Sequence, residues 1–121
     1  IPDFPMINKV TGEILSIEKV ADRNGIHSVS FTVENPYDYP LEFADPINPM
    51  RFFLVYQTGR TRFLTHLGAG PQGTIGPGEL LELTGYYYPT VEAGEYEVAV
   101  GLQPGRMSPV LITEKTRVVL Q

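Results

Sequence analysis

The sequence predicts an all-β protein, an antiparallel sandwich of seven to eight strands, on three observations. Apolar and polar residues alternate along 26–34, so that Val29, Phe31 and Val33 share one side of an extended chain. The 121 residues include 12 glycines and 11 prolines, which divide the chain into short segments. These segments recur about every ten residues, a spacing typical of sandwiches and barrels, so a barrel is the alternative architecture.

The predicted strands can be placed from the apolar pattern and the turn residues. They cover 12–20, 26–34, 41–43, 51–57, 60–66, 79–88, 95–103 and 109–120. A helix is the rival interpretation of the first segment, because Ile14, Ile17 and Val20 lie near helical spacing. The segment 51–57 is apolar on both faces, as expected of a strand whose outer face is covered.

The remaining segments are predicted to be connections. The stretch 67–78 is rich in glycine and proline and is expected to be a surface loop. The prolines near the N-terminus favour an extended arm over 1–10, which leaves a single domain over 11–121.

Composition and charge exclude several classes of function. Nine basic and fourteen acidic residues give a net charge of −5, which argues against a nucleic-acid or anionic-membrane surface. The absence of cysteine excludes disulfides, thiol catalysis and cysteine-bound metals. No apolar run approaches the roughly 18 residues that a membrane span needs. Because the chain begins at Ile1 without an initiator Met, we expect a processed or excised domain of a bacterial periplasmic or extracellular protein.

Two stretches carry a resemblance to a known group of domains. Residues 75–79 read Ile-Gly-Pro-Gly-Glu before one strand, and 91–98 read Val-Glu-Ala-Gly-Glu-Tyr-Glu-Val at the start of the next. This pattern resembles the ending of bacterial immunoglobulin-like domains, and the strand with Phe31 that ends at Asn35 is similar to another of their strands. The resemblance implies an immunoglobulin-like sandwich in which Gly94 opens a strand. Tyr96 would then form a tyrosine corner, its ring buried and its hydroxyl bonded to the preceding turn.

The same features are similar to domains related to the BsuPI intracellular proteinase inhibitor. These domains share a strand ending in Asn, a Pro-Gly turn and a Gly-x-Tyr strand. The likeness implies an inhibitor that presents a rigid exposed loop, for which 67–78 is the candidate segment, although its glycines argue against rigidity. Such motifs are architectural, so they indicate the fold more than the activity.

No catalytic constellation is visible, and we expect the protein not to be an enzyme. His27 and His66 lie on separate strands, and His27 is assigned to the polar side of its strand beside two serines. Ser108 lies in a turn and lacks the surroundings of a nucleophile elbow. Four glutamates alternate with core residues or bracket a strand start, as expected of a solvated face: Glu79, Glu82, Glu95 and Glu97.

We also expect no metal and no cofactor. Acidic and amide side chains cluster in two turns, but neither cluster has the spacing of a calcium-binding loop. The first cluster is Asp38, Glu42, Asp45 and Asn48, and the second is Asp22 and Asn24. The glycines of 68–73 are not followed by Lys-Ser or Lys-Thr, so they do not form a phosphate-binding loop.

The aromatic and arginine residues supply the candidate binding surface. If Tyr87 points inward, Tyr86 and Tyr88 point outward, and Phe52 and Phe53 likewise point to opposite faces. The only basic concentration lies on the hairpin 51–62. The candidate partner- or ligand-binding residues are therefore Phe53, Arg60, Arg62, Tyr86 and Tyr88.

These observations leave three hypotheses for function. The favoured one is a noncatalytic interaction or spacer module, which contacts a protein partner or a neighbouring domain. The second is a carbohydrate-binding module that stacks a polysaccharide on Tyr86 and Tyr88. The third is the proteinase inhibitor implied by the resemblance.

Overall fold

A computed structural model describes residues 7–20, 25–43, 49–68 and 73–120. These residues form ten β-strands and no helix, so the all-β prediction is confirmed. The strands are β1 (Thr11–Lys19), β2 (His27–Glu34), β3 (Leu41–Glu42), β4 (Met50–Thr58), β5 (Thr61–His66), β6 (Thr74–Ile75), β7 (Leu80–Tyr87), β8 (Gly94–Pro104), β9 (Val110–Leu111) and β10 (Thr116–Leu120).

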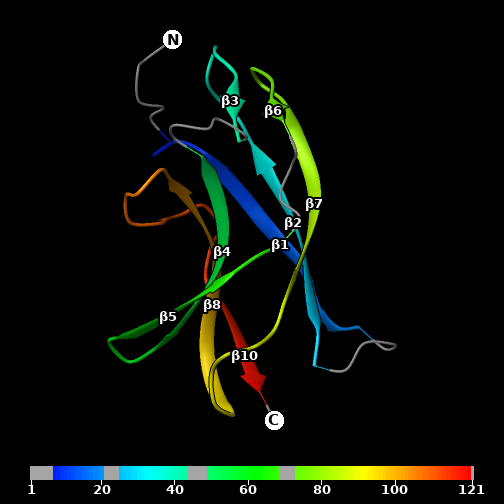
Figure 1. The fold of residues 1–121 in the computed structure, drawn as a ribbon, viewed down its shortest axis with the longest axis vertical. Coiled ribbons are helices and arrows are strands. Elements are labelled where there is room, and N and C mark those ends of the chain that lie inside the picture. The colour runs from blue at the N-terminus through cyan, green and yellow to red at the C-terminus, as the bar shows by residue number, and fades with distance from the viewer. Residues whose placement is uncertain (1–6, 21–24, 44–48, 69–72, 121) are drawn as a thin grey trace.

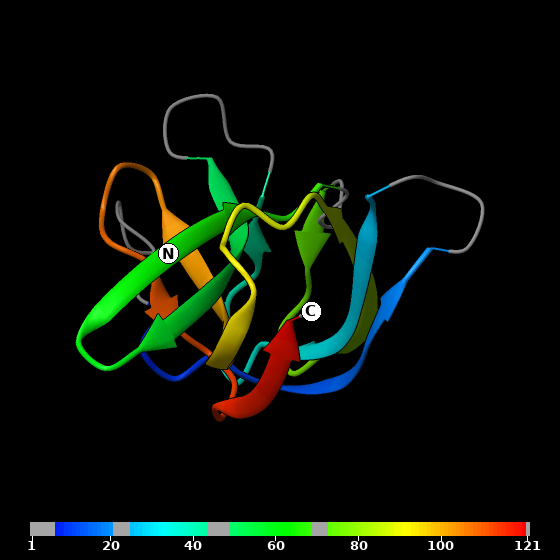
Figure 2. The ribbon, with the colours of Figure 1, turned by 90° about the horizontal axis from the view of Figure 1, so that it is seen from below.

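The strands pair antiparallel in three sheets and form a sandwich-like fold (Figure 1). One sheet has the order β1-β2-β7, and the facing sheet has the order β10-β8-β4-β5, with β9 also paired to β8. The short strands β3 and β6 form a two-stranded sheet of their own. Figure 2 looks along the long axis, with β1, β2 and β7 on one side and β4, β5 and β8 on the other.

The core lies between the two larger sheets. Val29, Phe31 and Val33 of β2 are buried, as their alternation predicts. Phe52 of β4 meets them from the opposite sheet, with its ring 5.2 Å from that of Phe31 and 5.4 Å from that of Phe43. Such edge-to-face and stacked rings add to the apolar burial that holds the sheets together.

A β-bulge explains why the first strand resembles a helix in sequence. In β1, Ile14 is paired with Phe31 and Ser16 with Ser30, so Leu15 is an extra residue between them. The bulge shifts the side-chain alternation by one position, and both Ile14 and Ile17 therefore pack against the core. The bulge therefore accounts for their helix-like spacing of three residues. The segment is a strand, as predicted.

The structure has more strands than the seven to eight predicted. Residues 67–78 are not only a surface loop, because Ile75 of β6 is fully buried opposite Leu41, and Leu67 is buried as well. The predicted last strand, 109–120, is broken into β9 and β10. At the break, the Thr113 hydroxyl accepts the Val100 N–H at 3.0 Å, in place of a backbone carbonyl.

The strands β4 and β8 are covered on both faces along their middle, as predicted for 51–57. Val55 and Ala99, on the outer face, are buried. Gly101 of β8 lies so close to Pro109 that an added Cβ would be 3.2 Å from the proline Cβ. The segment that leads into β9 therefore covers the outer face of the sheet at this point.

The N-terminal arm predicted over 1–10 is described from residue 7 onwards. Ile7 and Val10 are buried in the core. Directly after them, the Gly12 N–H donates to the Ile112 carbonyl at 2.8 Å, while Gly12 is also paired with Val33 of β2. Gly12 thus connects β1 to both β2 and the segment after β9.

Asn35 holds the end of β2 against the small β3–β6 sheet. Its side chain is fully buried. Its Nδ2 donates to the carbonyls of Tyr39, Ile75 and Gly76 at 2.9, 3.1 and 3.1 Å. Its Oδ1 accepts the Tyr37 N–H at 3.0 Å. One amide side chain therefore satisfies four backbone groups from two connections that are far apart in sequence.

Candidate functional site

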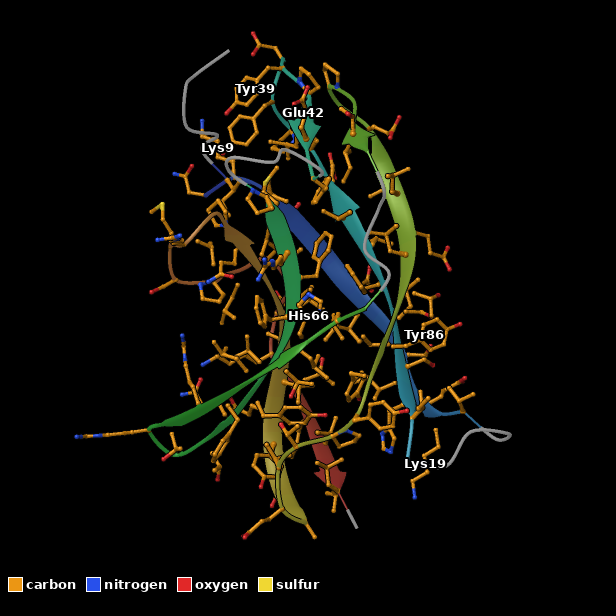
Figure 3. The ribbon with its side chains drawn as sticks, viewed as in Figure 1. Lys9, Lys19, Tyr39, Glu42, His66 and Tyr86 are labelled. Carbon is orange, nitrogen blue, oxygen red and sulfur yellow. The ribbon has the colours of Figure 1, made fainter. Side chains whose placement is uncertain are left out.

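The two histidines do not come together. The assignment of His27 to the polar side of its strand is wrong: His27 has the same parity as Val29 and Phe31, and its ring contacts that of Tyr87 at 5.7 Å. His66, labelled in Figure 3, lies on β5 in the other sheet, and its ring packs edge-on against that of Phe53 on the neighbouring strand β4, with the centroids 5.5 Å apart. Among the described residues, no three His, Asp or Glu side chains are grouped so that they could hold a metal ion.

A cleft of about 500 Å³ opens where the edges of the two larger sheets separate. It is lined by the ends of β1 and β10, the start of β2 and the 89–93 turn. Its apolar walls include Ile17, Val118 and Leu120, and its charged or titratable groups are Glu18, Lys19 and His27. Figure 3 shows Lys19 at the lower end of the molecule. Since the rim has one acid and one permanent cation, its charge favours no particular ligand.

Burial and the nearby Lys19 ammonium lower the pKa of His27 below its usual 6.5. The folded protein therefore binds this proton less tightly than the unfolded chain does. The stabilising contribution is fully present above pH 6.5 and is lost as the pH falls through the lowered pKa. Urea unfolding at about pH 7.5 and about pH 5.5 should show a smaller acid loss of stability for His27→Gln than for wild type. Equal losses would contradict the burial of the neutral imidazole.

The structure places Tyr96 near the start of β8, two residues after Gly94. Its ring is buried 5.6 Å from that of Tyr56, and its hydroxyl donates to the Glu92 carbonyl at 2.8 Å. Gly94 has a φ of 155° and its Cα lies against the Tyr96 ring, where an added Cβ would be 3.6 Å from a ring carbon.

Removal of the Tyr96 hydroxyl tests the importance of this bond. Tyr96→Phe leaves the Glu92 carbonyl without its partner and should lower the free energy of unfolding by about 1 kcal/mol. Tyr86→Phe is the matched control, because Tyr86 is exposed, and it should change stability by less than about 0.5 kcal/mol. Chemical denaturation of both variants gives the comparison, and equal midpoints would show that the bond contributes nothing.

The predicted binding residues fall into two separate groups. Tyr86 and Tyr88 are 48% and 62% exposed. Tyr86 is paired with Ser28 on the outer side of the β1-β2-β7 sheet, and Tyr88 lies near Gly25. Phe53 and Arg62 belong to the outer side of the facing sheet, and Arg60 lies in the turn between β4 and β5. The structure therefore divides the five residues between two sheets.

The β4–β5 hairpin is the most exposed apolar feature near the arginines, and Figure 1 shows it projecting from the molecule. Phe63 and Leu64 are 39% and 48% exposed on opposite faces of β5. Neither residue was singled out from the sequence. The available signal was that 60–66 lacks the clean apolar–polar alternation of 26–34, as expected of an edge strand with little burial on either face.

The other sequence candidates have ordinary surroundings. Glu95 forms an ion pair with Arg117 at 3.3 Å, and both side chains are mostly exposed. Ser108 is exposed in the turn before β9. Asp22, Asn24, Asp45 and Asn48, and most of the glycine-rich stretch 68–73, lie outside the described residues. Leu67 and Ile75, within the loop proposed for an inhibitor, are buried.

No family model and no curated protein sequence matches this chain. Along the described ranges there is no helix long and apolar enough to cross a membrane. The described residues establish the class of fold, which is all-β, antiparallel and sandwich-like. Its β4–β5 hairpin carries the exposed Arg60 and Arg62.

Proposed function

We propose that this chain is a noncatalytic immunoglobulin-like module that binds a protein partner through its β4–β5 hairpin. The strand order supports the immunoglobulin-like assignment, because β1-β2-β7 facing β10-β8-β4-β5 matches strands A-B-E facing G-F-C-C′. The bond from the Tyr96 hydroxyl to the Glu92 carbonyl is the second support, since a tyrosine corner belongs to the same group.

The observation that carries the interaction role is the exposure of Phe63 and Leu64 beside Arg60 and Arg62. Aromatic and arginine side chains are enriched in protein interfaces, and the projecting hairpin carries both, with Leu64 adding apolar area. The described residues contain no ion pair of Arg60 or Arg62. A spacer placed between domains of a bacterial extracytoplasmic protein would use the same surface to contact its neighbour.

Affinity capture with matched variants tests this function. The wild type, the double variant Phe63→Ser with Leu64→Ser, and the control Leu80→Ser are immobilised and exposed to an extract of the source cells. Leu80 is also exposed, but it lies on β7 of the other sheet. We expect at least one protein to bind the wild type and the control about tenfold more than the double variant. Identical capture by all three would contradict the proposal.

A carbohydrate-binding role is the second candidate, favoured by the exposure of Tyr86 and Tyr88. Their positions two residues apart would place the rings about 7 Å apart along one side of the chain. Affinity electrophoresis in gels containing soluble polysaccharides tests it. Retardation by one glycan that is lost in Tyr86→Ala and Tyr88→Ala would support stacking on these rings. Mobility unchanged by every glycan would count against it.

A further inference from the structure

The free edge of β5 exposes a defined set of backbone groups. Among the described residues, the sheet order ends at β5, and 61–66 are paired only with β4. The unpaired edge ends at Gly68, which is bonded to Tyr86 of β7. Leu67 N–H donates to the Phe52 carbonyl at 3.0 Å, which marks this as a hydrogen-bonded pair of the β4–β5 register. Because hydrogen-bonded pairs alternate in an antiparallel ladder, Thr61, Phe63 and Thr65 also bond to β4. The N–H and C=O groups of Arg62, Leu64 and His66 therefore point away from the sheet.

The side chains at this edge have a definite order. Arg62, Leu64 and His66 lie on the outer face, since they are paired with Gln57, Val55 and Phe53. Phe63 lies on the other face, partly exposed and packed 6.5 Å from the Tyr96 ring. A chain that extends the sheet would thus meet a cation, an aliphatic side chain and an imidazole in turn on one face, and an aromatic ring on the other.

The charge at the edge selects the occupant. Residues 58–68 include Arg60 and Arg62 but no carboxylate, in a chain whose net charge is −5. Across the sheet, Arg62 is paired with Gln57 of β4, which is paired with Glu97 of β8. The Glu97 carboxylate is therefore two strand spacings, or about 10 Å, from Arg62. A second copy pairing through its own β5 would bring Arg62 opposite His66 and would supply no carboxylate. An acidic strand from a partner satisfies both the backbone edge and the arginines.

We propose that the edge of β5 binds an extended acidic segment of a partner protein, which adds a sixth strand to the five-stranded sheet. The partner presents a carboxylate opposite Arg62, an apolar side chain opposite Leu64 and a carboxylate opposite His66. The partner segment should therefore have the sequence pattern acid-x-apolar-x-acid. This inference rests on the proposed function, because it specifies the partner of the same hairpin. Main-chain hydrogen bonds supply the affinity, and the alternate side chains supply the selection.

A synthetic peptide and residue-resolved hydrogen exchange test the binding mode. The probe is acetyl-Ser-Glu-Val-Leu-Val-Glu-Ser-amide, added to the full chain. We expect the amides of Arg62, Leu64 and His66 to become protected on binding, while those of Thr61, Phe63 and Thr65 are protected already. Binding without new protection at the three outward amides would overturn the proposal.

Matched peptides separate strand addition from simple charge attraction. N-methylation of the leucine amide removes a donor that faces β5 and should weaken binding at least about tenfold. N-methylation of a valine amide, which faces away, should change it by less than about twofold. Replacing both glutamates by lysine should abolish binding. Equal affinity of the two N-methylated peptides would show that the peptide binds without pairing to the edge.

Two protein variants complete the test. Arg62→Glu should lose the acidic peptide at least about tenfold and bind the lysine peptide instead, while its unfolding midpoint stays near that of the wild type. Leu64→Pro removes an N–H that points to solvent, which an edge strand tolerates, and should fold but not bind. Binding of the acidic peptide by a folded Arg62→Glu variant would contradict the proposed pairing.

The outcomes distinguish this inference from the proposed function. If hairpin-dependent capture of a partner persists but the peptide does not bind, the interaction role stands and the strand-addition mode is wrong. If the protein alone protects the three amides at high concentration and doubles in mass, a second copy occupies the edge and the acidic partner is wrong. If neither capture nor peptide binding depends on the hairpin, both proposals fail.

Discussion

Replacing Asn35 by Ala should cost about 3 kcal/mol or more of the free energy of unfolding, because it leaves buried backbone groups without partners. Three carbonyls lose the Asn35 Nδ2 donor and the Tyr37 N–H loses its acceptor. In a chain of this size, such a loss lowers Tm by about 12 °C or more. Asn35→Asp should be equally damaging, since it keeps the shape but brings oxygen against three carbonyl oxygens. Thermal and urea unfolding measure both variants.

Asn8→Ala is the matched control for this prediction. Asn8 Oδ1 accepts the Tyr37 hydroxyl at 3.0 Å, but this bond is exposed to solvent. Its loss should therefore change stability by less than about 0.5 kcal/mol. If Asn35→Ala were as mild as Asn8→Ala, the connections around β3 and β6 would have to be held by other contacts.

Gly12→Ala should also destabilise the fold by about 3 kcal/mol or more, because a methyl group at this position has no space. A Cβ at Gly12 would collide with the Thr32 carbonyl oxygen of β2, which is backbone and cannot rotate away. Relief requires β1 to move from β2, and that movement also disturbs the bond from Gly12 to Ile112. Urea unfolding should show a lower midpoint with an unchanged slope.

Gly68→Ala is the appropriate comparison for Gly12→Ala. Gly68 also bonds to a neighbouring strand, through Tyr86, but an added Cβ would lie 3.6 Å from the Tyr86 carbonyl oxygen, an ordinary contact distance. We expect this variant to lie within about 1 kcal/mol of the wild type. Similar losses in both variants would show that the collision with the Thr32 carbonyl is not the reason for glycine at position 12.

The long strands could be predicted from the sequence because burial on one face leaves a readable alternation. Val29, Phe31 and Val33 set the inner face of β2, and Tyr96, Val98 and Val100 do the same in β8. The assignment of a residue to the inner or outer face fails when it is based on the polarity of its neighbours and not on two-residue alternation. His27 is an example. Its serine neighbours suggested a polar face, but two-residue alternation places its ring against Tyr87.

The short strands could not be predicted, because two residues carry no periodicity. Leu41 and Ile75 pair across 33 intervening residues, and only the folded chain brings them together. The glycines and prolines around Ile75 predicted a surface loop, so the full burial of the Ile75 side chain was not expected. The Asn35 side chain that fixes this pairing was visible in sequence only as the end of a strand.

The candidate site was predicted only in part, for a related reason. Arg60 and Arg62 were recognised as the basic concentration, and they lie on or beside the exposed strand β5. The sequence could not assign strands to sheets, so it grouped Tyr86 with Phe53, which lie on different sheets. Nor could it show which strand ends a sheet, and the free edge of β5 is a property of that order alone.

The ionisation of the buried tyrosines, measured by ultraviolet absorbance, should report the alkaline unfolding of the chain. With no tryptophan, its near-ultraviolet absorption comes from seven tyrosines and six phenylalanines. Burial raises the pKa of both Tyr56 and Tyr87 above the usual 10.0. Their contribution to stability is present below pH 10.0 and is lost as the pH rises beyond it. We therefore expect these two rings to ionise only when the protein unfolds. Their tyrosinate absorbance should rise in the same cooperative transition as the loss of structure.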